Sequence, residues 1–274
     1  MTPFPPGPAL LFCPADRSDR YAKAAAAADG VILDLEDGVA PDDKPRARRA
    51  LQENLLDPRR TIVRINAAGT DDAARDLEVL ATTPYTLLML PKAEAAEQAE
   101  ALAPRQVIAL CETPRGVLAA SELAAVPTVV ALMWGAEDLV AAIGGRSSRH
   151  ADGRYRDLAR HARSATLLAA AASLTPAVDA VYLDIDDVDG LRREAEDGAA
   201  SGFIAKACIH PRQVAVVRAA FQPSPAEIAW AQRVLAAAER APGVFAFEGR
   251  MVDAPVLRHA QHLARTARTG RTRG

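Results

Sequence analysis

The feature that most constrains the fold is a regular alternation of short apolar segments with longer amphipathic ones along the 274-residue chain. Short runs rich in Val, Ile and Leu suit strands of a parallel sheet buried on both faces. About eight such strands are expected, nearly all followed by a helix. The alternation predicts a (β/α)8 TIM barrel, an α/β fold. The expected strands are Ala9–Cys13, Gly30–Leu35, Thr61–Ile65, Thr86–Leu90, Val107–Cys111, Val129–Trp134, Val178–Ile185 and Phe203–Ile209.

The segments between the expected strands supply the helices of the barrel. The most polar interval, Gly144–Arg156, interrupts the alternation, and we expect it to be a mobile loop over the active face. The expected helices are Arg20–Ala28, Lys44–Leu55, Asp71–Ala81, Glu94–Ala103, Pro114–Ala124, Asp157–Leu174 and Val188–Ala200.

The chain continues beyond the expected barrel, which we place at residues 1–222. Residues 223–274 contain an amphipathic helix at Ser224–Arg240, the segment VFAFEGRMVDAP and another helix at Val256–Thr266. This C-terminal helical extension has to pack somewhere, and a neighbouring subunit is an economical partner. The basic, glycine-rich tail RTARTGRTRG is expected to be disordered.

Composition excludes several classes of protein. Half of the residues are hydrophobic but 4% are aromatic, so the core must be aliphatic, and the formal charge of −2 gives no reason to expect a nucleic acid or a membrane as partner. The three cysteines, an odd number set far apart, indicate reduced packing residues rather than disulfides. The N-terminus resembles neither a signal peptide nor a membrane span. We therefore expect a cytoplasmic protein.

Polar residues stand at the carboxyl ends of most expected strands. In a barrel these ends form one mouth, where catalytic residues lie. The residues are Glu36 with Asp37, Arg64, Lys92, Glu112, Asp138, Asp184 with Asp186, and His210.

Two of these carboxylates indicate a metal site. Glu112 directly follows one strand, and Asp138 follows the next after the turn Gly135-Ala136-Glu137. Carboxylates with no His or Cys beside them suit a hard divalent cation such as Mg²⁺ or Mn²⁺. The alternative is that both are ordinary acids at helix starts.

The other strand-end residues each allow two interpretations. Arg64 suits a bidentate grip on a substrate carboxylate or carbonyl, or it neutralises Glu36 or Asp37 in a buried pair. Lys92 invites Schiff-base chemistry, although nearby carboxylates would raise its pKa and keep it protonated. His210 is a general base or a structural hydrogen bonder. Asp184 and Asp186 are outer-shell metal ligands or the start of a helix.

Several common motifs are absent from the sequence. It contains no GxGxxG or GxxxxGK[ST] phosphate loop and no GxSxG elbow. His259 and His262 lack a third ligand at useful spacing, which argues against zinc.

Nine sequence blocks together carry a resemblance to a known family. The chain closely resembles the citrate lyase β-subunit-like (CitE-like) proteins of the HpcH/HpaI aldolase and citrate lyase family from about Leu11 to Ala264. The blocks are LFCPADRSDR, GVILDLEDGVAPDDKPRAR, TIVRIN, LMLPK, ALCETPRGV, WGAEDL, VYLDIDD, GFIAKACIHPRQ and GRMVDAPV.

The resemblance implies a usually trimeric TIM barrel that binds Mg²⁺ and joins or cleaves a bond between an acyl-CoA enolate and a keto acid or ketone. By motif, Glu112 and Asp138 would be the metal ligands. Arg64 would contact an oxaloacetate- or pyruvate-like group. Asp253 would reach the neighbouring subunit's site as catalytic acid or base. The expected substrate-binding residues are Arg64, Glu112, Glu36, Asp37, Gly135 and Ala136.

The expected function is a Mg²⁺-dependent lyase that acts on β-hydroxyacyl-CoA thioesters of the citramalyl-, malyl-, citryl- or hydroxymethylglutaryl-CoA type and gives acetyl-CoA and a keto acid. Its partners would be these acyl-CoA substrates and other subunits of a homotrimer. A thioesterase acting on the same substrates, a subunit working with an acyl-carrier partner and a binding scaffold are the alternatives. A phosphoryl-transfer enzyme of the pyruvate/phosphoenolpyruvate barrel group is a weaker one.

Overall fold

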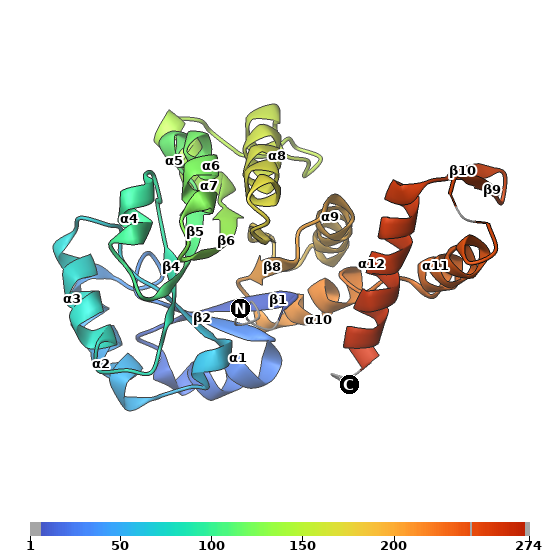
Figure 1. The fold of residues 1–274 in the computed structure, drawn as a ribbon. Coiled ribbons are helices and arrows are strands. Elements are labelled where there is room, and N and C mark those ends of the chain that lie inside the picture. The colour runs from blue at the N-terminus through green and yellow to red at the C-terminus, as the bar shows by residue number, and fades with distance from the viewer. Residues whose placement is uncertain (1–6, 242, 272–274) are drawn as a thin grey trace. The chain divides into compact units, whose positions relative to one another are not determined.

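Eight parallel strands close into a barrel in chain order from β1 to β8 and are surrounded by helices (Figure 1). This is a computed structural model, and it describes residues 7–241 and 243–271. The predicted (β/α)8 barrel is confirmed. The strands are β1 (Ala9–Pro14), β2 (Gly30–Asp34), β3 (Thr61–Arg64), β4 (Leu87–Leu90), β5 (Gln106–Cys111), β6 (Val129–Trp134), β7 (Ala177–Asp179) and β8 (Ala205–Cys208).

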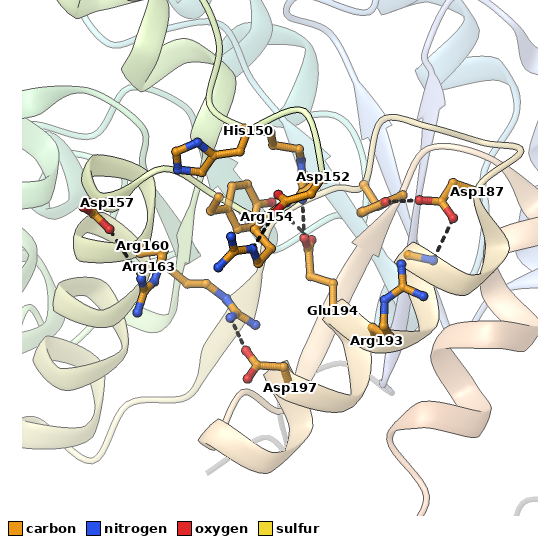
Figure 2. Close-up of a pocket in the computed structure, with 15 residues that line it drawn as sticks. His150, Asp152, Arg154, Asp157, Arg160, Arg163, Asp187, Arg193, Glu194 and Asp197 are labelled. Atoms are coloured by element: carbon orange, nitrogen blue, oxygen red, sulfur yellow. Dashed lines mark hydrogen bonds and ion pairs between the residues drawn. The ribbon is translucent and has the colours of Figure 1, made fainter.

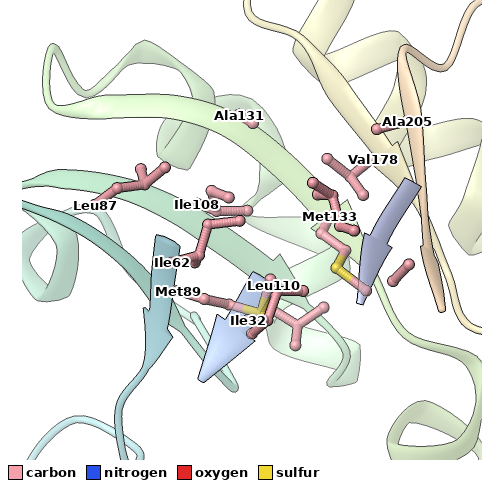
Figure 3. Close-up of a cluster of buried hydrophobic side chains, with 12 residues drawn as sticks. Ile32, Ile62, Leu87, Met89, Ile108, Leu110, Ala131, Met133, Val178 and Ala205 are labelled. Atoms are coloured by element: carbon pink, nitrogen blue, oxygen red, sulfur yellow. The ribbon is translucent and has the colours of Figure 1, made fainter. Parts of the chain in front are cut away.

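The barrel interior is packed with apolar side chains from all eight strands (Figure 3). They are Leu, Ile, Val, Met and Ala residues, and where one strand supplies two of them they are two positions apart, as expected for inward-facing positions. Because the interior is filled, polar side chains gather at the ends of the strands or between the strands and the surrounding helices. The buried cluster is Leu10, Ile32, Ile62, Leu87, Met89, Ile108, Leu110, Ala131, Met133, Val178, Ala205 and Ala207.

The helices of the barrel follow the predicted order, with differences at their ends. The predicted helix over Pro114–Ala124 is divided at Ala119, which leaves the helical conformation with ψ near 2°. The helices are α1 (Tyr21–Ala27), α2 (Lys44–Glu53), α3 (Asp71–Leu80), α4 (Ala96–Glu100), α5 (Pro114–Leu118), α6 (Ala120–Ala125), α7 (Ala136–Ile143), α8 (Asp157–Ala172), α9 (Val188–Ser201) and α10 (Pro211–Ala220).

The seventh strand is much shorter than predicted. The sequence predicts a strand over Val178–Ile185, but β7 has three residues. Beyond it, side chains take the backbone hydrogen bonds that a longer strand would make. Lys206 Nζ donates to the carbonyl of Ala180 at 2.7 Å, and Gln213 Nε2 donates to that of Tyr182 at 2.8 Å. The prediction was wrong because apolar residues in this stretch do not reveal that side chains satisfy the backbone.

The interval Gly144–Arg156 is anchored to its neighbours by several contacts. It begins at Gly144, which ends the unpredicted helix α7 in a left-handed conformation with φ of 77°. An isolated β-bridge joins Arg149 to Tyr155. The guanidinium of Arg149 stacks 3.8 Å from the Tyr155 ring centre and donates to Glu194 of α9 at 2.7 Å. These contacts fix the loop against the helical layer.

The chain divides into two compact units, Met1–Arg218 and Ala219–Gly274. The second unit contains α11 (Pro225–Ala238), the hairpin β9 (Phe245–Phe247) and β10 (Arg250–Val252), and α12 (Ala254–Arg271). Its small core includes side chains from both helices and from β10. The C-terminal helical extension is therefore confirmed.

The tail expected to be disordered is helical as far as Arg271. A helix that starts at Ala254 propagates into this segment, because each added residue of an existing helix gains a hydrogen bond and Arg and Ala favour the helical state. Residues 272–274 lie outside the described residues.

Two smaller expectations concern the cysteines and membranes. Cys13, Cys111 and Cys208 are free and buried, as predicted for packing residues. Among the residues that the structure describes, no helix is both long and apolar enough to cross a membrane.

Candidate active site

Six of the predicted site residues lie at the carboxyl edge of β2 to β6. Each follows a strand, ends one or lies in the first turn of the next helix, which is where residues of a parallel barrel meet. Lys92 Nζ contacts three of the carboxylates and thereby connects three strand ends. The six are Glu36, Asp37, Arg64, Lys92, Glu112 and Asp138.

The guanidinium of Arg64 is held on several sides. Its Nε and Nη2 donate to the two carboxylate oxygens of Asp34 at 2.7 and 2.6 Å. Its Nη1 lies 3.0 Å from Oε2 of Glu36, and the Phe12 ring centre lies 4.9 Å from the guanidinium carbon. Burial alone would lower the pKa of Arg64, but the hydrogen bonds to Asp34 and the charge of Glu36 raise it. Arg64 is therefore a permanent, oriented cation.

Asp34 is the partner of Arg64 that sequence reasoning missed. It lies inside the apolar run GVILDL, just before the more conspicuous acids Glu36 and Asp37 that follow the strand. An acid within a buried strand is itself a signal, because a buried carboxylate needs partners. Asp37, considered as a possible partner of Arg64, contacts Lys92 instead at 3.2 Å.

Lys92 is a fixed counter-ion for the acids. Its Nζ forms a short ion pair with Glu36 and lies 3.7 Å from Oδ1 of Asp138. Burial would lower the pKa of Lys92, but the hydrogen bond to Glu36 and the nearby charges raise it. The protonated ammonium argues against Schiff-base chemistry. Its backbone adopts a left-handed conformation, with φ of 49°.

Glu112 is a buried carboxylate whose nearby positive charge does not offset its burial. Its side chain is buried, and one oxygen accepts the N–H of Lys92 at 3.0 Å. Burial, and then the charges of Asp138 and Glu36, raise the pKa of Glu112 to about 8. Burial also raises the pKa of Glu36, and among the described residues no group donates a hydrogen bond to its Oε2. An additional cation would relieve this repulsion.

The residue after β6 must be small because it lies against Glu112. A Cβ atom on Gly135 would lie 2.8 Å from the Cβ of Glu112 and 2.9 Å from its Oε2, which is too close. Ala136 is buried beside it at the start of α7, and Asp138 lies in the first turn of the same helix. Gly135 therefore allows β6 to bring Asp138 near the Glu112 carboxylate.

The donor set fits Mg²⁺. Within residues 7–241 and 243–271, no group of three or more His, Cys, Asp or Glu side chains forms a metal cage. Magnesium commonly takes one or two protein carboxylates and keeps its other positions for water and substrate oxygens. Glu112 and Asp138, which repel each other and supply only oxygen ligands, match that requirement.

Two of the other strand-end candidates, Asp184 and His210, accept hydrogen bonds from the backbone. Asp184 Oδ1 accepts the N–H groups of Asp186 and Asp187, both at 3.1 Å. Nδ1 of His210 accepts the N–H of Arg212 at 3.2 Å. These contacts are typical of turn and helix starts, so the structural interpretation is favoured for Asp184 and His210. The structure brings neither of them into contact with the six residues of the edge.

Asp253 belongs to the C-terminal unit. Its Oδ1 accepts the N–H of Val256 at 3.2 Å, which caps the start of α12. The catalytic role expected for Asp253 stays a prediction.

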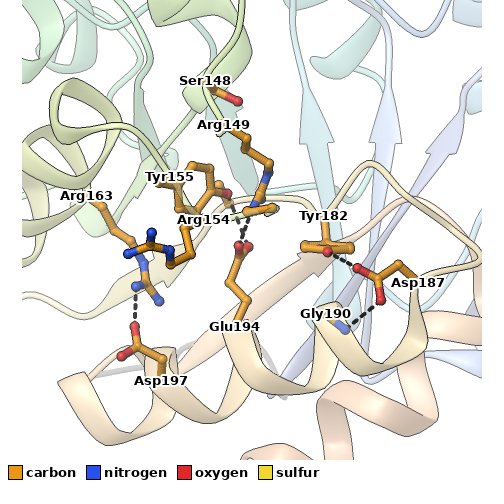
Figure 4. Close-up of polar contacts among 12 residues, drawn as sticks. Ser148, Arg149, Arg154, Tyr155, Arg163, Tyr182, Asp187, Gly190, Glu194 and Asp197 are labelled. Atoms are coloured by element: carbon orange, nitrogen blue, oxygen red, sulfur yellow. Dashed lines mark hydrogen bonds and ion pairs between the residues drawn. The ribbon is translucent and has the colours of Figure 1, made fainter. Parts of the chain in front are cut away.

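A second polar cluster, which the sequence did not predict, lies between the strands and helices α8 and α9. Asp179 of β7 is fully buried and accepts hydrogen bonds from Trp134 at 2.7 Å, from Arg163 at 3.0 Å and from Lys206 at 3.2 Å. Although burial opposes it, the charges of Lys206 and Arg163 lower the pKa of Asp179. The network continues through Glu194 to the loop that carries Arg149 (Figure 4).

A cavity of about 600 Å³ opens beside this network (Figure 2). Arginines and carboxylates line it in equal numbers, and four of the arginines form ion pairs with lining carboxylates, so the cavity has no excess of either charge. The charged lining residues are Arg149, Arg154, Arg160, Arg163 and Arg193 with Asp152, Asp157, Asp187, Glu194 and Asp197.

Comparison with proteins of known sequence gives three informative relatives. A citrate lyase subunit beta-like protein of Mycobacterium tuberculosis is 63% identical over 95% of this chain and 96% of its own length. A (3S)-malyl-CoA thioesterase of Cereibacter sphaeroides is 38% identical, with coverage of 89% and 88%. Human mitochondrial citramalyl-CoA lyase is 34% identical, with coverage of 94% and 84%.

Solved structures and family models agree with these relatives. The crystal structure of CitE from Mycobacterium tuberculosis, in complex with magnesium, acetoacetate and coenzyme A, matches with a TM-score of 0.94 and 61% identity, covering 97% of this chain and 99% of that one. Residues 9–211 match the model of the HpcH/HpaI aldolase/citrate lyase family. The resemblance seen in the sequence blocks is confirmed, and the chain belongs to the HpcH/HpaI aldolase/citrate lyase family.

Proposed function

We propose that the protein is a Mg²⁺-dependent carbon–carbon lyase that cleaves β-hydroxyacyl-CoA thioesters to acetyl-CoA and a keto acid. The observation that carries this proposal is the arrangement of Glu112 and Asp138 beside the oriented cation Arg64. The magnesium, acetoacetate and coenzyme A bound by the Mycobacterium tuberculosis protein support the same chemistry. The substrate would be of the citramalyl-, malyl-, citryl- or hydroxymethylglutaryl-CoA type.

Retro-aldol cleavage needs a base for the hydroxyl group and positive charge where the carbonyl and the enolate form. Held by Glu112 and Asp138, Mg²⁺ would supply a Lewis acid at the forming carbonyl. Arg64 would bind the carboxylate or carbonyl oxygens of the keto acid product and stabilise their charge. Lys92 keeps Glu36 and Asp37 in place as paired ions.

The proton at the acetyl carbon requires a further group. In this proposal Asp253 protonates or deprotonates that carbon from a neighbouring subunit, which makes the C-terminal unit part of the catalytic machinery. The proposed assembly is a homotrimer. The free, buried cysteines fit a reducing compartment, so we place the enzyme in the cytoplasm.

A thioesterase is the second candidate, because one relative carries the name (3S)-malyl-CoA thioesterase. The same site would then bind the acyl-CoA, with water as the acceptor. The name of the Mycobacterium tuberculosis relative also favours a third candidate, a subunit that works with an acyl-carrier partner.

A product assay distinguishes these candidates. The purified protein is incubated with Mg²⁺ and malyl-, citramalyl-, citryl- or hydroxymethylglutaryl-CoA, and acetyl-CoA, free CoA and keto acid are measured separately. The lyase yields equal amounts of acetyl-CoA and keto acid. Free CoA with the intact hydroxy acid establishes the thioesterase. Neither product from any substrate contradicts both and points to a subunit that needs a partner.

A mixing experiment tests the role of Asp253 across subunits. Asp253→Asn and Arg64→Lys proteins should each be inactive, and refolding them together should restore activity, because some sites then combine two intact residues. Absence of recovery in mixed assemblies would show that Asp253 does not act on a neighbour's site.

A further inference from the structure

We propose that Asp34 is a positioning residue for this reaction: it fixes the guanidinium of Arg64 so that its free edge meets the oxo-acid group. The inference rests on the proposed function, which gives Arg64 its ligand. Asp34 itself would not touch the substrate. It ends β2 directly opposite Arg64 in the parallel register of β2 and β3.

Asp34 occupies one edge of the Arg64 guanidinium, and the N–H donors of another edge remain for a ligand. A guanidinium has five N–H donors in a fixed plane, and Asp34 engages Nε and one hydrogen of Nη2. The three remaining donors are the second hydrogen of Nη2 and the two hydrogens of Nη1. Within the described part of the chain, Oε2 of Glu36 makes no hydrogen bond although Nη1 lies 3.0 Å away. The ion pair with Glu36 makes no aligned hydrogen bond, so the edge formed by Nη1 and Nη2 still has N–H donors that can bind a planar carboxylate or carbonyl pair.

The carboxylate of Asp34 is as firmly held as the guanidinium it orients. Oδ1 also accepts the N–H of Glu36 at 3.0 Å, and Oδ2 accepts the N–H of Gly38 at 2.9 Å. A Cβ on Gly38 would lie 2.3 Å from Oδ2, so a glycine is required for this approach. Four N–H groups thus fix both oxygens, and Asp34 cannot rotate without losing several of them.

The arrangement has a consequence for catalysis. Phe12 covers one face of the guanidinium, Asp34 holds one edge, and the side chain of Arg64 is 12% exposed. A cation held in this way loses little freedom when it binds the oxo acid, which is the benefit of preorganisation. Without Asp34, Arg64 would turn toward Glu36, and its open edge would no longer be directed at the ligand.

The test is a double-mutant cycle read out by binding of pyruvate, the simplest 2-oxo acid, in saturating Mg²⁺. Asp34→Asn keeps the shape of the side chain and one acceptor oxygen but removes the charge. Arg64→Lys keeps the charge but removes the planar guanidinium and its parallel N–H donors. Calorimetry should show about 10- to 100-fold weaker pyruvate binding for Asp34→Asn. In the Arg64→Lys background, Asp34→Asn should weaken pyruvate binding by no more than about twofold. Asp34→Glu, which keeps the charge and displaces it, should also weaken binding.

Asp29→Asn is the matched control, because Asp29 lies at the opposite end of β2. It accepts the N–H of Ala9 at 3.0 Å and pairs with Arg218 at 3.0 Å. This change should leave pyruvate binding unaltered. The positioning role would be overturned if both Asp34 variants bound pyruvate as tightly as the unmodified protein. It would also be overturned if Asp34→Asn weakened binding equally with Arg64 and with Arg64→Lys. If the unmodified protein binds no pyruvate with Mg²⁺, the proposed function itself is wrong.

Discussion

The two clusters of buried charge in the barrel unit differ in whether their charges are satisfied. At the carboxyl edge, Glu112 and Glu36 have raised pKa values because burial, together with the charges of Asp138 and Glu36 on Glu112 and of Asp37 on Glu36, outweighs the nearby cations. Between the strands and α8 and α9, Asp179 has a lowered pKa because Lys206 and Arg163 outweigh burial. The edge is therefore incomplete without a further cation, and the inner cluster is complete.

The difference shows how buried charge can indicate function. A fully paired cluster such as that of Asp179 joins β6, β7, β8, α8 and α9 and serves the fold. A cluster with repelling carboxylates costs stability, and a protein keeps such a cluster where a ligand compensates. Opposite effects of mutation in the two clusters are expected: loss of activity at the edge and loss of stability in the inner cluster.

Glu112→Gln should produce the largest effect on activity. Removal of one of the two proposed metal ligands should lower turnover by at least about 100-fold. The melting temperature should stay the same or rise because a buried repulsion disappears. Turnover with acyl-CoA and thermal unfolding are the two measurements. Excess EDTA should bring the unmodified enzyme down to the same residual rate. Full turnover of the variant in EDTA would refute the metal mechanism.

Asp179→Asn should reverse that pattern. It leaves Lys206 and Arg163 buried without their common partner, which should lower the free energy of unfolding by about 3–5 kcal/mol. Urea unfolding at neutral pH measures the loss, and turnover per folded molecule should stay near that of the unmodified enzyme. A stable Asp179→Asn protein with lost turnover would place this cluster in the active site and remove the contrast.

Gly135→Ala should affect metal binding more than folding. The added methyl group would lie within 3 Å of Glu112, so the carboxylate or β6 must shift. We expect the Mg²⁺ concentration for half-maximal activity to rise about 10- to 100-fold. If this Mg²⁺ concentration did not change, the close approach of Gly135 to Glu112 would not be needed for metal binding.

The stability of the metal-free protein should depend on pH through Glu112. Its pKa is about 8 in the folded protein against 4.5 for the free group, so its favourable contribution is complete below about pH 4.5 and is lost as pH rises through about 8. In EDTA, the free energy of unfolding should fall over this interval relative to Glu112→Gln. Parallel curves for the two proteins would show that Glu112 is not the group that titrates.

Sequence reasoning predicted the barrel because strand and helix periods alternate so regularly, and it identified the edge because acids follow strands. It missed Asp34 and Asp179, which lie within apolar strands and whose partners come from distant segments. It also extended β7 too far, since only the folded chain shows that Lys206 and Gln213 bind the backbone there. Local sequence patterns predict helices, strands and the residues at strand ends. The pairing of side chains that are far apart in the sequence can be seen only in the structure.

The most direct test of the central claim is a calorimetric titration of Mg²⁺ into the unmodified protein, Glu112→Gln and Asp179→Asn at matched folded concentrations. The account predicts one ion per chain in the unmodified protein and in Asp179→Asn, and no detectable binding in Glu112→Gln. Retained binding in Glu112→Gln, or a loss confined to Asp179→Asn, would contradict the assignment of the magnesium site to the carboxyl edge of the barrel.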